Sequence, residues 1–259
     1  MSSPVLCFDI ETVPDVTGLR ALNPEYAGPA DDNAVVAQAI ARRQEKTGSD
    51  FLPLHQHRIV AIGCLLRTDD VLTIRCLGQP EDPEEKLLAL FFRQIERYTP
   101  QLVSWNGSGF DLPVMNYRCL AKGIMAPRFW DMGEEDRDFK WNNYISRYHS
   151  RHLDLMDLLA MYSPRASAPL DELARICGFP GKMGMDGSQV WESFQAGGLP
   201  QIRAYCETDV ANTYLMYCRF QLTRGHWIAE RYEQEVGRLR ELLTDSGESH
   251  WQEFVQNWP

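Results

Sequence analysis

The sequence has 259 residues, enough to bury a full core as one large domain or as two small ones. Apolar residues make up 44% and charged residues 24%, as in an ordinary globular protein, and no apolar run approaches the ~20 residues that cross a bilayer. The net charge of −10 argues against a protein that grips long nucleic acid by non-specific phosphate contacts, but not against an enzyme that holds a strand end through metal ions.

The N-terminal segment and the cysteines favour a cytoplasmic protein. The segment has no basic stretch and reaches a carboxylate at Asp9, which is not typical of a secretory signal peptide. Seven cysteines form no C-x-x-C pair and leave one over, so they fit neither a disulfide framework nor a zinc site. We expect reduced cysteines, several of them in the core.

The first half of the chain predicts three strands, a helix, a fourth strand and a second helix. A turn that contains Asp69 and Asp70 joins the second and third strands, which favours an antiparallel hairpin. This order is typical of an α/β domain with a mixed sheet and not of a repeating βαβ array. The predicted elements are Pro4–Thr12, Arg58–Leu66, Val71–Leu77, Pro83–Tyr98, Gln101–Trp105 and Asp111–Lys122.

The second half is predicted to be mainly helical. Apolar residues of His152–Leu159 fit the periods of both a strand and a helix, so both remain open there. Residues 1–220 are expected to form one domain, with 221–259 as a helical extension packed on it. The predicted helices are Asp171–Cys177, Leu199–Thr223 and Ile228–Leu243, and the tail carries a spaced aromatic stripe of Trp251, Phe254 and Trp258.

An inserted helical segment is predicted between the first two strands, at about 21–57. Asp31, Asp32 and Asn33 can cap a helix over Ala34–Thr47, and Gly48 would end it. A surface helix is the simpler interpretation, and a mobile flap near a functional site is the alternative.

Asp9 and Glu11 are the first candidates for chemistry. Residues two apart in a strand share a face, and here the apolar Phe8 and Ile10 occupy the opposite one. Two carboxylates at the end of an apolar strand repel each other and lose solvation, and a divalent cation corrects both. Alternatively, both face solvent beyond the strand, and a D-x-E pair alone is weak evidence.

A second candidate segment is SWNGSGFD, at 104–111. Its glycines permit a sharp turn after a strand, and Asp111 then begins a helix, where the helix dipole alone also favours a carboxylate. The functional hypothesis is that this turn projects Asn106 and Asp111 toward the first strand. Phe110 would then be a hydrophobic or stacking contact at the rim.

The third candidate pair is Tyr205 and Asp209. They are four residues apart, so on a helix they lie on one face about a turn apart. A phenol and a carboxylate together can hold and orient a water molecule, as a hydrolytic step requires. Taken alone, they could equally be boundary residues of an amphipathic helix.

In this order, the three segments resemble the exonuclease motifs of the DEDDy class of 3′–5′ exonucleases. They are FDIET at 8–12, NGSGFD at 106–111 and YCETD at 205–209. The tract Gly181–Tyr217 is particularly similar to a bacterial family of predicted exonucleases related to the proofreading domain of family-B DNA polymerases. The resemblance spans roughly Val5–Tyr217. It implies a single ribonuclease-H-like domain, a mixed five-stranded sheet flanked by helices, without an attached polymerase.

The resemblance also implies the chemistry. Asp9, Glu11, Asp111 and Asp209 would bind metal, and Tyr205 would position the attacking water. Two Mg²⁺ ions ~3.5–4 Å apart would clamp the scissile phosphate, and Mn²⁺ is expected to substitute for them. The expected substrate is nucleic acid with a free 3′ end, with single-stranded DNA expected and RNA as the alternative, and the products would be nucleoside 5′-monophosphates.

Further residues are candidates for substrate binding. The segment KWNNYISRYHSRH, at 140–152, interleaves basic and aromatic side chains, which suits a single strand but also an irregular surface segment. Arg147 and His152 belong to it, although a structural role for His152 is the simpler interpretation. Lys182 could contact a phosphate or be a solvated loop residue. The rival hypotheses are a phosphohydrolase of small nucleotides and a non-catalytic nucleic-acid-binding module.

Overall fold

A five-stranded mixed sheet organises the chain. The computed structural model describes residues 3–27 and 31–259. The strand order is β3-β2-β1-β4-β5, in which β1 is antiparallel to β2 and parallel to β4, and β4 is parallel to β5. The predicted ribonuclease-H-like fold is therefore confirmed. The strands are β1 (Val5–Pro14), β2 (His57–Arg67), β3 (Leu72–Cys76), β4 (Gln101–Ser104) and β5 (His152–Asp154).

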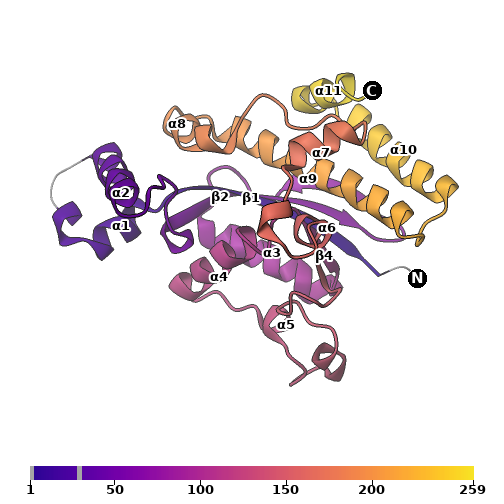
Figure 1. Cartoon of the computed structure of the whole chain (residues 1–259), viewed down its shortest axis with the longest axis horizontal. Helices are drawn as coiled ribbons and strands as arrows, with labels where there is room; N and C mark the ends of the chain where they lie inside the picture. Colours follow the sequence, from indigo (N-terminus) through magenta and orange to yellow (C-terminus); the bar gives the residue numbers. More distant parts are fainter. Residues whose placement is uncertain (1–2, 28–30) are drawn as a thin grey trace.

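Helices cover both faces of this sheet (Figure 1). On one face α9 lies with α7, α8, α10 and α11, and on the other lie α3, α4 and α5, whereas α1 and α2 lie beyond one end of the sheet. The α-helices are α1 (Val16–Leu22), α2 (Asp32–Thr47), α3 (Glu84–Tyr98), α4 (Asp111–Lys122), α5 (Pro127–Trp130), α6 (Leu155–Leu159), α7 (Leu170–Ile176), α8 (Val190–Gln195), α9 (Leu199–Thr223), α10 (Ala229–Asp245) and α11 (Ser249–Gln256). Short 3₁₀ turns are η1 (Pro24–Ala27), η2 (Leu54–Gln56), η3 (Arg137–Lys140), η4 (Pro164–Ala166) and η5 (Gly187–Gln189).

The central strand β1 separates two hydrophobic cores by the alternation of its side chains. Leu6, Phe8 and Ile10 enter the core that α3 and α4 cover. Val5 and Cys7 enter the core beneath α9. Because the period is two, the residues that follow Cys7 on its own face of the strand are also directed toward α9.

The inserted segment has a small hydrophobic core of its own, which includes Leu19, Val35 and Leu52. The predicted helix is present as α2. The Asp31 carboxylate accepts a hydrogen bond from the backbone N–H of Ala34, and the left-handed backbone at the following glycine ends the helix. α1 begins only two residues after β1, earlier than the expected start of the insertion.

The ambiguous segment His152–Leu159 contains both predicted element types. β5 ends at Asp154, whose carboxylate accepts from the backbone N–H of Asp157 and so caps α6. Both strand and helix periods were visible because the segment changes from one to the other. α1, α8 and α11 were not predicted, because helices of six to eight residues show too few periodic apolar positions.

The C-terminal helices contribute to the core between the sheet and α9. Trp251, Phe254 and Trp258 are buried in the same cluster as α9 residues, so the aromatic stripe of the tail packs onto the domain. Within residues 3–27 and 31–259, no helix combines the length and the apolar character that crossing a bilayer requires.

Candidate active site

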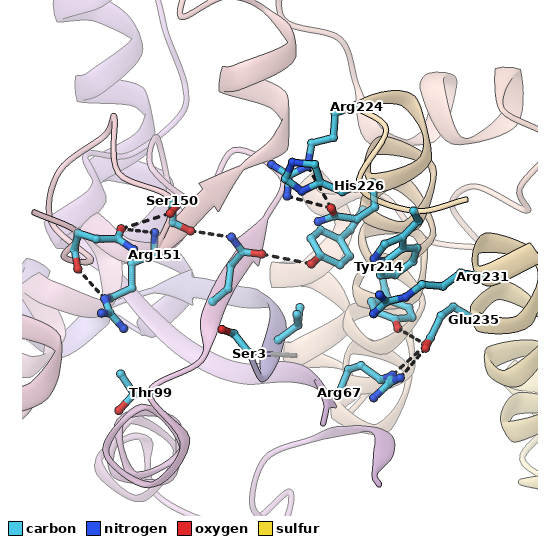
Figure 2. A pocket seen from close by; sticks show the side chains of 16 residues that line it. Ser3, Arg67, Thr99, Ser150, Arg151, Tyr214, Arg224, His226, Arg231 and Glu235 are labelled. Carbon is cyan, nitrogen blue, oxygen red and sulfur yellow. Dashed lines mark hydrogen bonds and ion pairs between the residues drawn. The ribbon is translucent and has the colours of Figure 1, made fainter. Parts of the chain in front are cut away.

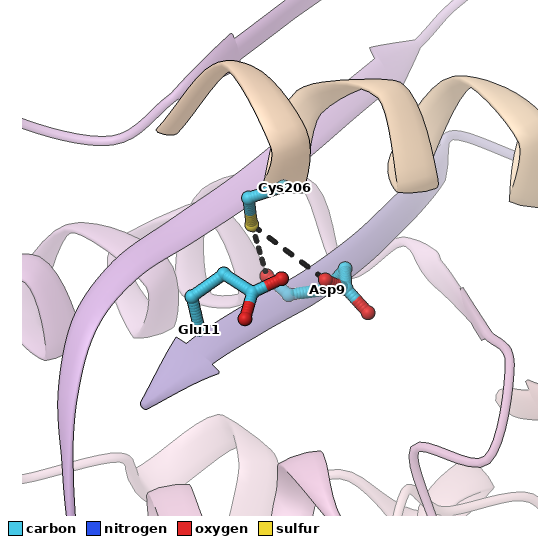
Figure 3. Close-up of side chains that lie close together, drawn as sticks. All are labelled: Asp9, Glu11 and Cys206. Atoms are coloured by element: carbon cyan, nitrogen blue, oxygen red, sulfur yellow. Dashed lines mark hydrogen bonds between the residues drawn. The ribbon is translucent and has the colours of Figure 1, made fainter. Parts of the chain in front are cut away.

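Asp9 and Glu11 lie where β1 extends past its neighbour β4. The pairing of these two strands ends at Cys7, because β4 leaves the sheet after Ser104. Figure 3 shows both carboxylates projecting from β1 toward Cys206 of α9. Ligand atoms of these three side chains lie within 4.8 Å of one another.

Asp111 is held against the same strand. It begins α4, and its Oδ1 accepts a hydrogen bond of 3.0 Å from the backbone N–H of Ile10, between the two strand carboxylates. The turn before it is fixed by Asp154, whose carboxylate accepts from the N–H groups of Asn106 and Ser108 at 2.9 Å each. The structure thus brings the first two sequence segments together through the bond between Ile10 and Asp111, while Asp154 fixes the turn that leads to Asp111.

α9 carries Tyr205 and Asp209 over the strand carboxylates. Its close approach depends on Gly63, which pairs with Asp9 in the sheet register. A Cβ at Gly63 would lie 2.9 Å from Val210 Cγ2 and 3.0 Å from Cys206 Sγ. A larger residue would therefore push α9 away from the site.

Lys182 enters the site from a loop that is fastened to two helices. Asn212 of α9 accepts from the Gly181 N–H at 3.1 Å and donates to the Gly181 carbonyl at 2.8 Å. Asp171 of α7 accepts from the Lys182 N–H at 2.6 Å. Gly181 has φ +76°, and a Cβ there would lie 2.5 Å from Asp171 Oδ1, so the loop requires glycine.

The ammonium group of Lys182 is the cation within this set of carboxylates. Its Nζ donates to the Tyr205 hydroxyl and lies 3.5 Å from Asp209 Oδ2. The side chain is 32% exposed, so it is not a fully solvated loop lysine. Its ammonium group contacts both the Tyr205 hydroxyl and the Asp209 carboxylate on α9.

The electrostatics of the site favour protons or cations on its carboxylates. Burial raises the pKa of Asp9, and repulsion from Asp111, Glu11 and Asp209 raises it further. Burial likewise raises the pKa of Glu11, of Asp111 to about 7 and of Asp209 to about 6. Burial also raises the pKa of the Tyr205 hydroxyl, which therefore stays protonated near neutral pH.

These residues fit a divalent cation. Carboxylate oxygens are the donors that Mg²⁺ and Mn²⁺ prefer, and such a cation would offset the mutual repulsion of the four acids. Oδ1 of Asp209 is buried without a hydrogen-bond partner among the described residues, as expected of an atom reserved for a ligand. The Cys206 thiol is a weaker candidate, because burial raises its pKa and it donates to the Asp9 carbonyl at 3.4 Å.

We predict that the metal-free protein loses stability as the pH rises from about 4 to about 7. Asp111 and Asp209 have raised pKa values in the folded state, so the unfolded chain releases its protons first and the folded state becomes disfavoured. Thermal unfolding in EDTA should show a fall that is smaller in Asp209→Asn. Added Mn²⁺ should raise the melting temperature more at about pH 8 than at about pH 5. The prediction is wrong if, across this pH range in EDTA, the melting temperature of the wild type does not fall relative to that of Asp209→Asn.

The structure places the remaining predicted residues around the Asn106 turn. Phe110 packs against Phe51 and His57, with ring centroids 5.9 and 5.7 Å away. Asn106 has a left-handed backbone, φ 66°, and lines a cavity of about 690 Å³ that Arg147 and His152 also line.

The contacts of Arg147 and His152 differ. Arg147 is exposed and pairs with Asp157 through two hydrogen bonds of 2.6 and 2.5 Å. His152 is buried and shares a hydrogen bond of 2.8 Å with Ser104 Oγ. Burial lowers the pKa of His152 to about 4, so its ring is neutral. These contacts favour the structural interpretation of His152.

A family model of predicted 3′–5′ exonucleases related to the exonuclease domain of PolB matches residues 49–258. The chain belongs to this family. The match includes the turn with Asp111 and the helix with Tyr205 and Asp209, whereas β1 with Asp9 and Glu11 precedes it. Among curated proteins, none matches the chain.

This match confirms the resemblance to predicted exonucleases related to the proofreading domain of family-B DNA polymerases. The match extends to residue 258, so it also includes α10 and α11. An exonuclease of this family acts on nucleic acid, and domains of this kind typically use divalent metals. The carboxylates of β1, α4 and α9 supply a suitable set of ligands.

Proposed function

We propose that the protein is a metal-dependent 3′–5′ exonuclease of the DEDDy type that releases nucleoside 5′-monophosphates from single-stranded DNA. The observation that carries the proposal is the convergence of Asp9, Glu11, Asp111 and Asp209 with Tyr205 between the sheet and α9. The family supports a nuclease, and the phenol beside the carboxylates supports the tyrosine type. All seven cysteines are free, which suits a reducing compartment, and we place the enzyme in the cytoplasm.

Asp9, Glu11, Asp111 and Asp209 would hold the metal, two Mg²⁺ ions in our proposal. When bound, the metal lowers the pKa of a water molecule and stabilises charge on the phosphate and the leaving oxygen. The protein residues hold the reacting groups in place. The backbone N–H of Ile10 keeps Asp111 oriented, and the turn fixed by Asp154 keeps α4 at this position.

Tyr205 is assigned to orient the attacking water. Its protonated hydroxyl accepts a hydrogen bond from Lys182 and is also hydrogen-bonded to Asp209, so it is held beside the proposed metal ligands. Lys182 also places a positive charge beside the position of a substrate phosphate. Only 4% of Tyr205 is exposed, so the packing around its ring holds the hydroxyl in place.

Tyr205→Phe should lower kcat by about 100-fold, the usual contribution of a positioned proton-transfer group. The rise in melting temperature on adding Mn²⁺ should be retained, because the four carboxylates remain. Tyr26→Phe is a matched control, since the buried Tyr26 hydroxyl has no hydrogen-bond partner among the described residues. A kcat within about twofold of the wild type would contradict the role of Tyr205.

The substrate assignment is tested by a time course on single-stranded DNA, duplex DNA and RNA of matched sequence. We expect Mg²⁺ to support the fastest release of mononucleotides from single-stranded DNA and EDTA to stop it. Faster release from RNA would replace the DNA assignment and leave the reaction type in place. Binding of all three without turnover in Mg²⁺ or Mn²⁺ would overturn the proposed function.

A further inference from the structure

A cavity of about 530 Å³ lies at the opposite end of β1 from the carboxylates. Val5, the first residue of the strand, lines it, and Asp9 follows four residues later, about 13 Å along the strand. The loop between α9 and α10 and the segment before β5 form its walls. Figure 2 shows Arg151 on one side of this cavity and Arg224, His226 and Arg231 on the other. We call it the arginine cavity.

The arginine cavity is positively charged in a protein whose net charge is −10. Glu235 is the carboxylate among its lining residues, and it is already paired with Arg67 at 2.8 and 2.5 Å. In contrast, no carboxylate of residues 3–27 and 31–259 lies within ion-pair distance of Arg151, Arg224 or Arg231. Three guanidinium groups without a carboxylate partner at one cavity favour an anionic ligand.

The planar side chains that line the cavity favour an anionic ligand that also carries aromatic rings. The guanidinium of Arg231 lies over the half-buried ring of Trp227, with its carbon 4.8 Å from the ring centroid. Trp227 in turn meets Tyr217 edge to face, with centroids 5.9 Å apart. Aromatic rings and guanidinium planes are the surfaces on which bases of single-stranded nucleic acid stack.

Two further cavities lie between the arginine cavity and the Asn106 turn, and each shares lining residues with its neighbour. Ser150 and Arg224 also line a cavity of about 180 Å³ beside β5. Ser108 and Arg147 line that cavity and also the one of about 690 Å³ that reaches Asn106. The basic and aromatic segment at 140–152 runs along this whole path. The three cavities therefore lie in a row along the β5 edge, from the arginine cavity to the Asn106 turn, which leads into Asp111.

We propose that the arginine cavity binds the single strand upstream of the nucleotide being removed. This inference rests on the proposed function, because the strand must have its 3′ end at the carboxylates. The row of neighbouring cavities favours a strand over a free mononucleotide. The phosphates contact Arg151, Arg224 and Arg231, and a base stacks on Trp227. The cavity thus compensates for the acidic surface of the protein and gives longer strands an advantage.

The test compares binding of oligothymidylates of about 4 and about 16 nucleotides by fluorescence anisotropy in EDTA. Arg224→Ala/Arg231→Ala should raise the Kd of the long strand about 10-fold and that of the short strand less than about twofold. The slope of log Kd against log salt should fall by about 1.4 for the long strand, since each phosphate contact contributes about 0.7. Arg93→Ala, at an exposed position of α3, is the matched control and should change neither value.

Equal effects of the double variant on both lengths, or no effect on either, would overturn the inference. So would competition by free thymidine 5′-monophosphate that the double variant abolishes, because the cavity would then be a separate nucleotide site. Hydrolysis of both strands by the wild type in Mg²⁺ is measured in parallel. If the wild type cleaves neither strand, the proposed function fails, while the length dependence of binding still decides the role of the cavity.

Discussion

Asp9→Asn and Asp209→Asn should each lower the rate of mononucleotide release about 1000-fold. Metal ligation contributes several kcal/mol of charge stabilisation in reactions of this kind, and each factor of ten corresponds to about 1.36 kcal/mol. The rate is measured on 3′-labelled single-stranded DNA with Mg²⁺. Asp245→Asn, at an exposed position near the end of α10, is the matched control and should retain the wild-type rate. Undiminished release in both site variants would exclude the assignment.

The same two variants should be more stable than the wild type in EDTA. Burial raises the pKa of Asp9 and of Asp209, and repulsion from other acids raises that of Asp9 further, so their charged forms disfavour the metal-free fold. Removing one charge should raise the free energy of unfolding by roughly 1–3 kcal/mol near pH 8. Lost activity together with gained stability distinguishes a binding site from a structural ion cluster, in which the same variants would lose stability.

Arg118→Met should lower the free energy of unfolding by about 3–5 kcal/mol. Arg118 lies on α4, is buried, and donates to Asp15 at 2.5 Å and to Glu84 at 2.6 and 2.8 Å. Removing the guanidinium leaves two buried carboxylates without a counter-charge. For a chain of this size the melting temperature should fall by about 10 °C.

Two further variants separate charge from packing at Arg118. Neutralising both partners together, as Arg118→Met with Asp15→Asn and Glu84→Gln, should recover more than half of the lost stability. Arg93→Met, at an exposed position of α3, should change it by no more than about 0.5 kcal/mol. A loss below about 1 kcal/mol in Arg118→Met would show that this buried ion pair does not hold α4 against β1 and α3.

The residues of the candidate site could be proposed from the sequence because they stand at short, regular spacings. Asp9 and Glu11 share a strand face, Asp111 begins a helix after a glycine turn, and Tyr205 and Asp209 are one helical turn apart. Each relation spans a few residues and follows from strand or helix geometry alone. The order of these segments along the chain then favoured the ribonuclease-H-like fold, and the family match agrees with that fold.

The contacts that hold the site together were not predictable in the same way. Asp154 fixes the Asn106 turn across 48 residues, and Asn212 holds Gly181 across 31. Arg118 joins Asp15 across 103 residues. No local pattern marks such pairs, because either partner alone is an ordinary polar residue. The same holds for the arginine cavity, whose basic residues are scattered along the sequence and come together only when α9 and α10 pack on the sheet.

The direction of degradation and its need for metal are tested most directly by following a label at each end of one DNA strand. Single-stranded DNA labelled at its 3′ or its 5′ end is incubated with the protein in Mg²⁺ and in EDTA. The 3′ label should appear at once as a nucleoside 5′-monophosphate, while the 5′-labelled strand should shorten by one nucleotide at a time. EDTA should stop both processes. Internal cleavage, release from the 5′ end first, or equal release in EDTA would contradict a metal-dependent 3′–5′ exonuclease built on Asp9, Glu11, Asp111 and Asp209.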